Sequence, residues 1–243
     1  MPDKELFKQH ISQQFNSELE EIRTQLLEMG GLVEKQINDA IVALIEGDAK
    51  LAEQVREKDD AINQMELDID QECMRILARR QPAASDLRLV ISISKIIVDL
   101  ERIGDEASKI ARRAIDLVEA GQAPKGYVEC RHIGHHVRRM VQEALDAFAR
   151  MDTDQAFSVA REDKSVDQEY KSAMREMITF MMEDPRSISR VLNILWVLRS
   201  LERVGDHARN VAEHVIYLVK GTDVRHIGLK RMEAEVRRED NPE

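Results

Sequence analysis

Two pairs of carboxylate residues recur at one spacing in this chain. Glu101 and Asp105 are four residues apart, and so are Glu202 and Asp206. On a helix this spacing places both members of a pair on one face, where like charges repel by roughly a few tenths of a kcal/mol. Something must offset that repulsion, and both a neighbouring cation and a bound metal ion are candidates.

The cations next to these pairs give the simpler interpretation. Arg102 and Arg203 each follow a glutamate directly, so a solvated face with mixed charges would balance the repulsion. The alternative is a metal site. An all-oxygen donor set favours hard cations such as Mg²⁺, Ca²⁺, Mn²⁺ or ferric iron over zinc. Adjacent helices supply secondary candidates at the same spacing, namely Asp59 with Asn63 and Asp163 with Asp167.

The position of the pairs on their helices predicts what kind of site they form. At 100° per residue, the apolar stripe of the first motif's helix is centred on Ile97, Leu100 and Ala107. Glu101 and Asp105 then fall on the outer, polar face, and the second pair has the same relation to its own stripe. We therefore expect a superficial, solvent-accessible site. His207 points about 100° away from Asp206 and is a weak ligand candidate.

Gly104 and Gly205 occupy the same register in the two motifs. Glycine inside a helix costs about 1 kcal/mol relative to alanine. Its presence twice at one position indicates a close helix–helix approach, or room for something bulky, and we assign it a structural role.

The motifs belong to an internal duplication of the chain. Residues 100–105 (Leu-Glu-Arg-Ile-Gly-Asp) recur at 201–206 as Leu-Glu-Arg-Val-Gly-Asp, and Val33 and Ile37 align upstream with Val137 and Val141. The repeat predicts two units of one design. We assign residues 1–121 to the first three-helix bundle, residues 122–221 to the second, and residues 222–243 to a charged, frayed tail.

We predict three long helices in each unit. Apolar residues make up 43% of the chain and aromatic residues only 4%, which favours helices over a β-sandwich. Turn signals divide each half: Gly47-Asp48, Pro82 and Gly121 with Pro124 in the first, and Asp152-Thr153-Asp154, Asp184-Pro185 and Gly221 in the second. The predicted fold is all-α, with six long up-and-down helices in two tandem pseudo-symmetric bundles.

Composition excludes several classes of function. The net charge of −10 argues against nucleic acid as the main partner. Cys73 and Cys130 have no zinc-like or disulfide-like spacing, which suggests a reducing compartment. The most apolar stretch, residues 87–100, is too short and too interrupted to span a bilayer, and residues 1–5 start no signal peptide. We expect a cytoplasmic protein.

Other chemistry-bearing residues give weaker signals. His132, His135 and His136 lie near a helix start with Glu129, but a single Glu-x-x-His is no di-iron signature, so we expect a surface cluster. Trp196 is expected to be packed or near an interface. No phosphate-binding loop, nucleophile elbow or Cys-His pair is present, so we assign no catalytic residue.

The two motif copies, together with residues 81–88 (Gln-Pro-Ala-Ala-Ser-Asp-Leu-Arg), resemble the PhoU family of bacterial phosphate-signalling proteins. The resemblance covers about residues 5–221. It implies a six-helix, two-bundle homodimer that acts with the phosphate-specific ABC transporter and the phosphate-sensing histidine kinase. Such a protein keeps the phosphate-starvation regulon off and restrains uptake. In some members the motifs that correspond to Glu101 with Asp105 and Glu202 with Asp206 carry metal clusters.

These observations predict a non-enzymatic adaptor that negatively regulates phosphate homeostasis. Two alternatives come from other classes. A carboxylate-bridged metal oxidase is disfavoured because paired Glu-x-x-His motifs are missing. A structural helical scaffold is disfavoured because the repeat is far longer than a heptad and its acidic pairs recur in register.

Overall fold

The chain folds almost entirely into helices. A computed structural model describes residues 3–121 and 128–238, with side chains from residue 13 onward, and no strand occurs among the described residues. The all-α prediction is confirmed. The elements are α1 (Asp3–Glu46), α2 (Ala49–Glu57), α3 (Asp59–Arg80), α4 (Ala84–Glu119), α5 (Val128–Arg150), α6 (Thr153–Glu183), the 3₁₀ turn η1 (Pro185–Ser187), α7 (Ile188–Lys220) and α8 (Leu229–Val236).

The helix ends follow from local sequence. Asp48 and Asp152 are N-caps whose carboxylates each accept a backbone N–H at 2.9 Å, from Leu51 and Gln155. Gly221 ends α7 in the left-handed conformation, with φ of 73°, which glycine adopts without strain. The predicted turns at Pro82 and Pro185 also separate helices. Pro124 lies outside the described residues.

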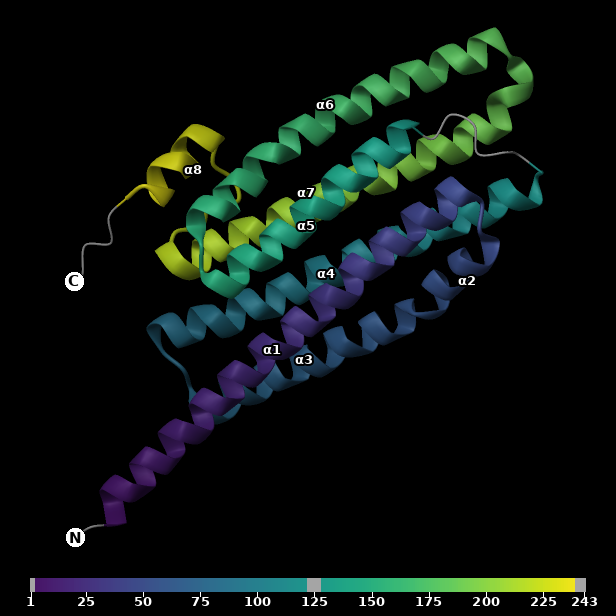
Figure 1. Cartoon of the computed structure of the whole chain (residues 1–243). Helices are drawn as coiled ribbons and strands as arrows, with labels where there is room; N and C mark the ends of the chain where they lie inside the picture. The colour runs from purple at the N-terminus through teal and green to yellow at the C-terminus, as the bar shows by residue number, and fades with distance from the viewer. Residues whose placement is uncertain (1–2, 122–127, 239–243) are drawn as a thin grey trace.

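Two helical layers pack side by side (Figure 1). In one layer α4 packs against α1, α2 and α3, and in the other α7 packs against α5 and α6. The layers are joined by α4 against α7 and by α1 against α5. The core is built from aliphatic residues and continues across both layers. The helices that carry the acidic motifs are therefore the two central helices of the molecule.

The first half departs from three uninterrupted helices. The chain between Asp48 and Pro82 is broken at Lys58, which ends α2 and precedes α3, whereas its counterpart α6 is continuous. The break makes Asp59 the first residue of α3. A carboxylate there is stabilised by the positive end of the helix dipole.

The expectation of a frayed C-terminal tail is wrong for the described part of that tail. Residues 229–236 form α8, which packs against α6 and α7. Met232 is fully buried, and Val224 and Val236 join the same core. Many residues of this segment are charged, and this composition suggested fraying. The few apolar residues among them are the ones that pack against the core. Among the described residues, no helix is long and apolar enough to cross a membrane.

Candidate acidic clusters in the two halves of the molecule

The first acidic cluster lies between α3 and α4. Glu101 and Asp105 come from the middle of α4, and Asp59 comes from the start of α3. Arg102 lies 3.6 Å from Glu101, and Lys109 lies 3.6 Å from Asp105. Asn63 is half-buried one turn after Asp59. The topology thus places the primary and secondary candidates of the first half together.

Burial and mutual repulsion perturb this cluster. Burial raises the pKa of Glu101, and the neighbouring carboxylates of Asp105 and Glu66 raise it further. Burial likewise raises the pKa of Asp59, with a contribution from Asp105, while a hydrogen bond from Gln36 opposes the change. Both carboxyl groups are therefore protonated more readily than an exposed carboxylate. A nearby cation would instead stabilise their charged forms.

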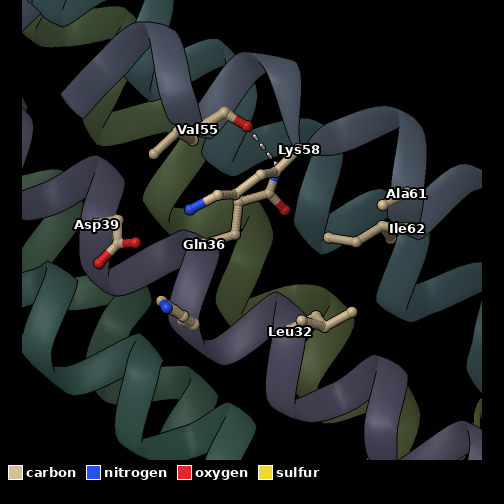
Figure 2. A pocket seen from close by; sticks show the side chains of 8 residues that line it. Leu32, Gln36, Asp39, Val55, Lys58, Ala61 and Ile62 are labelled. Carbon is tan, nitrogen blue, oxygen red and sulfur yellow. Dashed lines mark hydrogen bonds between the residues drawn. The ribbon is translucent and has the colours of Figure 1, made fainter. Parts of the chain in front are cut away.

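Gln36 connects this cluster to a small pocket beside the break at Lys58. Its Nε2 donates to Asp59 Oδ1 at 3.0 Å and to the carbonyl of Val55 at 3.2 Å. Figure 2 shows Gln36 on α1 reaching towards Val55 and Lys58, with Leu32 and Ile62 at the other side of the pocket. The cavity is about 120 Å³ and mostly apolar. Gln36 Oε1 is buried without a hydrogen-bond partner.

The second acidic cluster lies between α6 and α7. Glu202 and Asp206 come from α7, and Asp163 and Asp167 come from α6. Burial raises the pKa of Glu202, which Asp206 raises further. Asp206 is exposed, yet partial desolvation of its carboxylate, followed by the charges of Asp163 and Asp167, raises its pKa as well.

Cations fill much of this second cluster. Arg199 Nη1 donates to Glu202 Oε1 at 2.6 Å, and Lys171 lies 3.3 Å from Asp167. Arg209 donates to Asp163 at 3.1 Å and to Glu213 at 2.9 Å. Burial of Asp163 raises its pKa, and the hydrogen bond and charge of Arg209 oppose that change. Glu202 Oε2, in contrast, is buried and has no hydrogen-bond partner.

The predicted position of the acidic pairs on an outer, solvent-accessible face is wrong for their glutamates. Glu202 is only 8% exposed and Glu101 is half-buried, whereas Asp105 is half-buried and Asp206 is exposed. The reason is that α4 packs against α1, α2, α3 and α7, so that helices cover more than one of its faces. A central helix of this kind has no single apolar stripe from which a polar face can be deduced.

The motif glycines lie where another helix passes close by. A Cβ at Gly104 would stand 3.1 Å from Gln36 Oε1 and 3.4 Å from Ile62, and one at Gly205 would stand 3.4 Å from Val166. Arg203, from the second motif, lies 3.1 Å from the buried Glu106 of α4 and so joins the two halves. Arg102, by comparison, is exposed.

The two clusters differ in charge balance although they share a motif. In the repeat, Gln36 aligns with Met140 and Ser108 with Arg209. Asp59 of the first cluster therefore accepts from a neutral amide, whereas Asp163 of the second accepts from a guanidinium; the cations of the first cluster, Arg102 and Lys109, lie farther off, at 3.6 Å from Glu101 and Asp105. A cation entering the second cluster would meet a fixed positive charge, so the first cluster is the better candidate for a metal ion.

The donor set fits a hard cation chemically, but the side chains need to move. The carboxylates provide oxygen ligands, and Gln36 Oε1 and Glu202 Oε2 are buried oxygens that a cation would satisfy. As the described side chains stand, however, no group of three or more His, Cys, Asp or Glu residues could hold a metal ion. Rotation of the carboxylates would be required.

A polar network between α4 and α7 escaped prediction. Asp99 is 8% exposed and accepts hydrogen bonds from Asn210 at 3.0 Å and His207 Nδ1 at 2.9 Å, with His214 Nε2 3.6 Å away. His207, a weak metal-ligand candidate by its direction, thus binds the other half of the molecule. The only sequence signal was an aspartate within an apolar run, in residues 87–100.

Two residues of the histidine cluster, His132 and His136, contact carboxylates between α5 and α6. His136 is largely buried and lies between Glu169, at 3.1 Å, and Glu162, at 3.3 Å. His132 is exposed and lies 3.5 Å from Glu169. The surface position expected from the sequence therefore holds for the exposed His132 and His135 but not for His136.

Comparison with known proteins is decisive for the family. The PhoU domain matches residues 26–114 and 130–215, one copy in each half of the chain. This chain belongs to the PhoU family. The recognition made from the two motifs and residues 81–88 is confirmed.

Curated PhoU relatives match along nearly the whole chain. The phosphate-specific transport system accessory protein PhoU homolog of Pseudomonas putida is 72% identical over 97% of this chain and 92% of its own length. The phosphate-specific transport system accessory protein PhoU of Escherichia coli is 52% identical over 90% of each chain. The shared region therefore includes both bundles.

Solved PhoU structures match the fold. PhoU from Pseudomonas aeruginosa has a TM-score of 0.84 at 73% identity and covers 86% of this chain and all of that one. The phosphate transport system regulatory protein PhoU from Streptococcus pneumoniae has a TM-score of 0.79 at 35% identity and covers 86% of this chain and 99% of that one.

Proposed function

We propose that this protein is a non-enzymatic accessory protein of a phosphate-specific transport system, and that it negatively regulates both phosphate uptake and the phosphate-starvation regulon. The observation that carries the proposal is the match, at 72% identity over 97% of the chain, to relatives that bear this name. In this role it couples the phosphate ABC transporter to the sensor histidine kinase at the cytoplasmic face of the membrane, as a homodimer.

A non-enzymatic role agrees with the state of the strongest nucleophiles in the chain. Cys73 and Cys130 are both buried free thiols, and burial raises the pKa of each to about 12. Thiols in this state stay protonated at neutral pH and are poor nucleophiles.

A gene deletion tests the regulatory role. In phosphate-rich medium, the deletion strain should express a starvation-regulated phosphatase reporter at a high level, and plasmid-borne wild-type protein should restore repression. Reporter activity that stays low in the deletion strain would refute negative regulation. Transporter-dependent uptake of labelled phosphate in the same strains separates the effect on transport from the effect on transcription.

We further propose that the acidic clusters bind hard cations, Mg²⁺, Mn²⁺, Ca²⁺ or ferric iron, and that the first cluster does so more tightly. Glu101, Asp105 and Asp59 would supply the ligands there, and Glu202, Asp206, Asp163 and Asp167 in the second cluster. The supporting observations are the raised carboxylate pKa values and the buried oxygens without partners. A bound cation would remove the repulsion within each cluster.

Elemental analysis tests the cation sites. Wild-type protein, Glu101→Gln, Glu202→Gln and the double variant are loaded with each metal and desalted before measurement. We expect the loss to be larger for Glu101→Gln, and complete in the double variant. Equal metal contents in wild-type protein and the double variant would refute these sites without bearing on the regulatory role.

A further inference from the structure

An apolar stripe on α7 is exposed although the chain has a large aliphatic core. Ile188, Leu192 and Trp196 are spaced by four residues and are 43%, 47% and 59% exposed. This spacing places them along one face of the helix. A single exposed apolar residue is ordinary, but three large ones in register on one helix indicate a contact surface.

A cationic pocket adjoins the Trp196 end of this stripe. It lies between α4 and α7, has a volume of about 320 Å³, and is lined by Trp196 together with Lys109, Arg113, Arg199 and Arg203. Glu106 is the one carboxylate in its lining and is 2% exposed. In a chain with a net charge of −10, this local excess of cations stands out.

The pocket cations keep donors available for another molecule. Arg199 donates through Nη1 to Glu202, and Arg113 through Nη1 to Asp116. A guanidinium has five N–H donors, so these bonds leave several on each arginine. The four cationic side chains are between 35% and 51% exposed. The buried Glu106 lies 3.0 Å from Lys109 and 3.1 Å from Arg203, which fixes two of the cations at the pocket.

We propose that the stripe and the pocket together form a docking surface for an acidic amphipathic helix of a partner protein. The partner places leucine-like side chains along Ile188, Leu192 and Trp196, and carboxylates against the four pocket cations. The elongated stripe fits a helix with anchors at every turn, and the excess of cations selects an acidic one. The inference is independent of metal binding and goes beyond the proposed regulatory role.

Trp196 reports binding directly because it is the single tryptophan of the chain. The probe is a capped peptide of about 18 residues, above the length at which isolated helices are marginal. It carries leucine on one face, glutamate on the flanks, alanine elsewhere and no tryptophan. Titration into the full-length protein should shift the tryptophan emission to the blue and saturate. A peptide with lysine in place of glutamate should leave the emission unchanged.

Variants locate the binding site by anisotropy of a fluorescein-labelled copy of the acidic peptide. Trp196→Ala should weaken binding by about tenfold or more, as expected for a truncated aromatic anchor. Arg113→Glu should weaken it and flatten its salt dependence. Arg75→Glu is the matched control, since Arg75 on α3 lines neither the stripe nor the pocket and the change in charge is the same. Circular dichroism establishes that each variant is folded.

Three results would contradict the proposal that an acidic helix binds this surface. Equal peptide affinity for wild-type protein and Trp196→Ala would overturn the proposal. So would an emission shift produced by a nucleoside triphosphate or inorganic phosphate but not by the peptide. A third contrary result is a wild-type dimer that ignores the peptide and dissociates on Trp196→Ala substitution, since a second copy would then cover the surface.

Discussion

At the scale of single residues, the most unusual groups are carboxylates that are buried with incomplete compensation of their charge. Glu202 is 8% exposed, repelled by Asp206, and bound through one oxygen only. Such a group destabilises the metal-free protein when it is charged, because folding removes it from water with incomplete compensation.

Glu202→Gln should stabilise the metal-free protein at pH 7 by a few tenths to about 1 kcal/mol. The amide keeps an acceptor for Arg199 and removes the repulsion by Asp206. Because the pKa of Glu202 is raised on folding, the gain should shrink as the pH falls and the wild-type carboxyl becomes protonated. Urea unfolding of both proteins in the presence of a chelator, at several pH values, measures the difference in their free energies of unfolding. A variant less stable than wild type at neutral pH would contradict this account.

His214 should make folding sensitive to acid. Burial lowers its pKa from 6.5 to about 4, opposed by Asp99 and aided by Lys95 and Arg225. The unfolded chain therefore binds a proton between pH 6.5 and 4 that the folded chain does not, so stability falls as the pH falls through this window. Relative to His214→Gln, wild-type protein should lose about 1–2 kcal/mol there.

The measurement for His214 is the difference between the two urea-unfolding curves at each pH. The raised carboxylate pKa values of the acidic clusters increase stability as the pH falls, opposite to the effect of His214. Both proteins share this contribution, so it cancels in the difference. A constant difference between pH 7 and 4 would contradict the assignment to His214.

At the scale of elements, the joint between α1 and α5 depends on glycine. A Cβ at Gly30 would stand 2.6 Å from Leu145, and one at Gly134 would stand 2.7 Å from Ile41, whereas nothing lies within 4 Å of a Cβ at Gly31. Each helix thus presents a glycine to an aliphatic side chain of the other. The two layers approach closely here because these positions have no side chain.

Gly30→Ala and Gly31→Ala are a matched pair one residue apart. Gly31→Ala should stabilise the protein by about 0.5–1 kcal/mol through helix propensity alone. Gly30→Ala gains the same propensity but forces Leu145 to move, and should lower stability by about 1–2 kcal/mol. Chemical denaturation of both variants checks the pair. Equal effects would show that the α1–α5 joint yields easily.

At the scale of the whole molecule, the two halves share one core. The contacts of α4 with α7 and of α1 with α5 bury aliphatic residues from both repeats, and Asp99 binds His207 and Asn210 across the joint. Halves joined in this way lose partners when either one unfolds. The sequence repeat describes the origin of the halves and does not make them independent.

The protein should therefore unfold in a single cooperative transition. Calorimetric and van't Hoff enthalpies should agree, as they do for one cooperative unit. Asp99→Ala should lower stability by about 2–4 kcal/mol, because it removes the acceptor shared by the buried His214 and the half-buried His207 and Asn210. Two resolved transitions in wild-type protein would instead mean that each bundle folds by itself.

Sequence alone determined the helical class, the duplication, most helix ends and the family, because these depend on local signals. Capping residues, turn-forming glycine and proline, helical periodicity and a repeated six-residue motif are all readable within one segment. Periodicity also made Asp59 and Asp163 secondary candidates, since they lie at the flank of the apolar stripes of their own helices, where a neighbouring helix can meet them. Local signals could not show which faces of the central helices α4 and α7 are covered by other helices.

Only the tertiary structure decided the environments of those residues. Glu202 is buried because α6 lies over it, Gln36 reaches Asp59 from another helix, and Asp99 meets His207 more than a hundred residues away. α8 is ordered because Met232 and Val236 find apolar surface on the bundle. Burial, pKa and partner choice come from packing between distant segments, and a periodic pattern within one helix does not encode which neighbours will cover it.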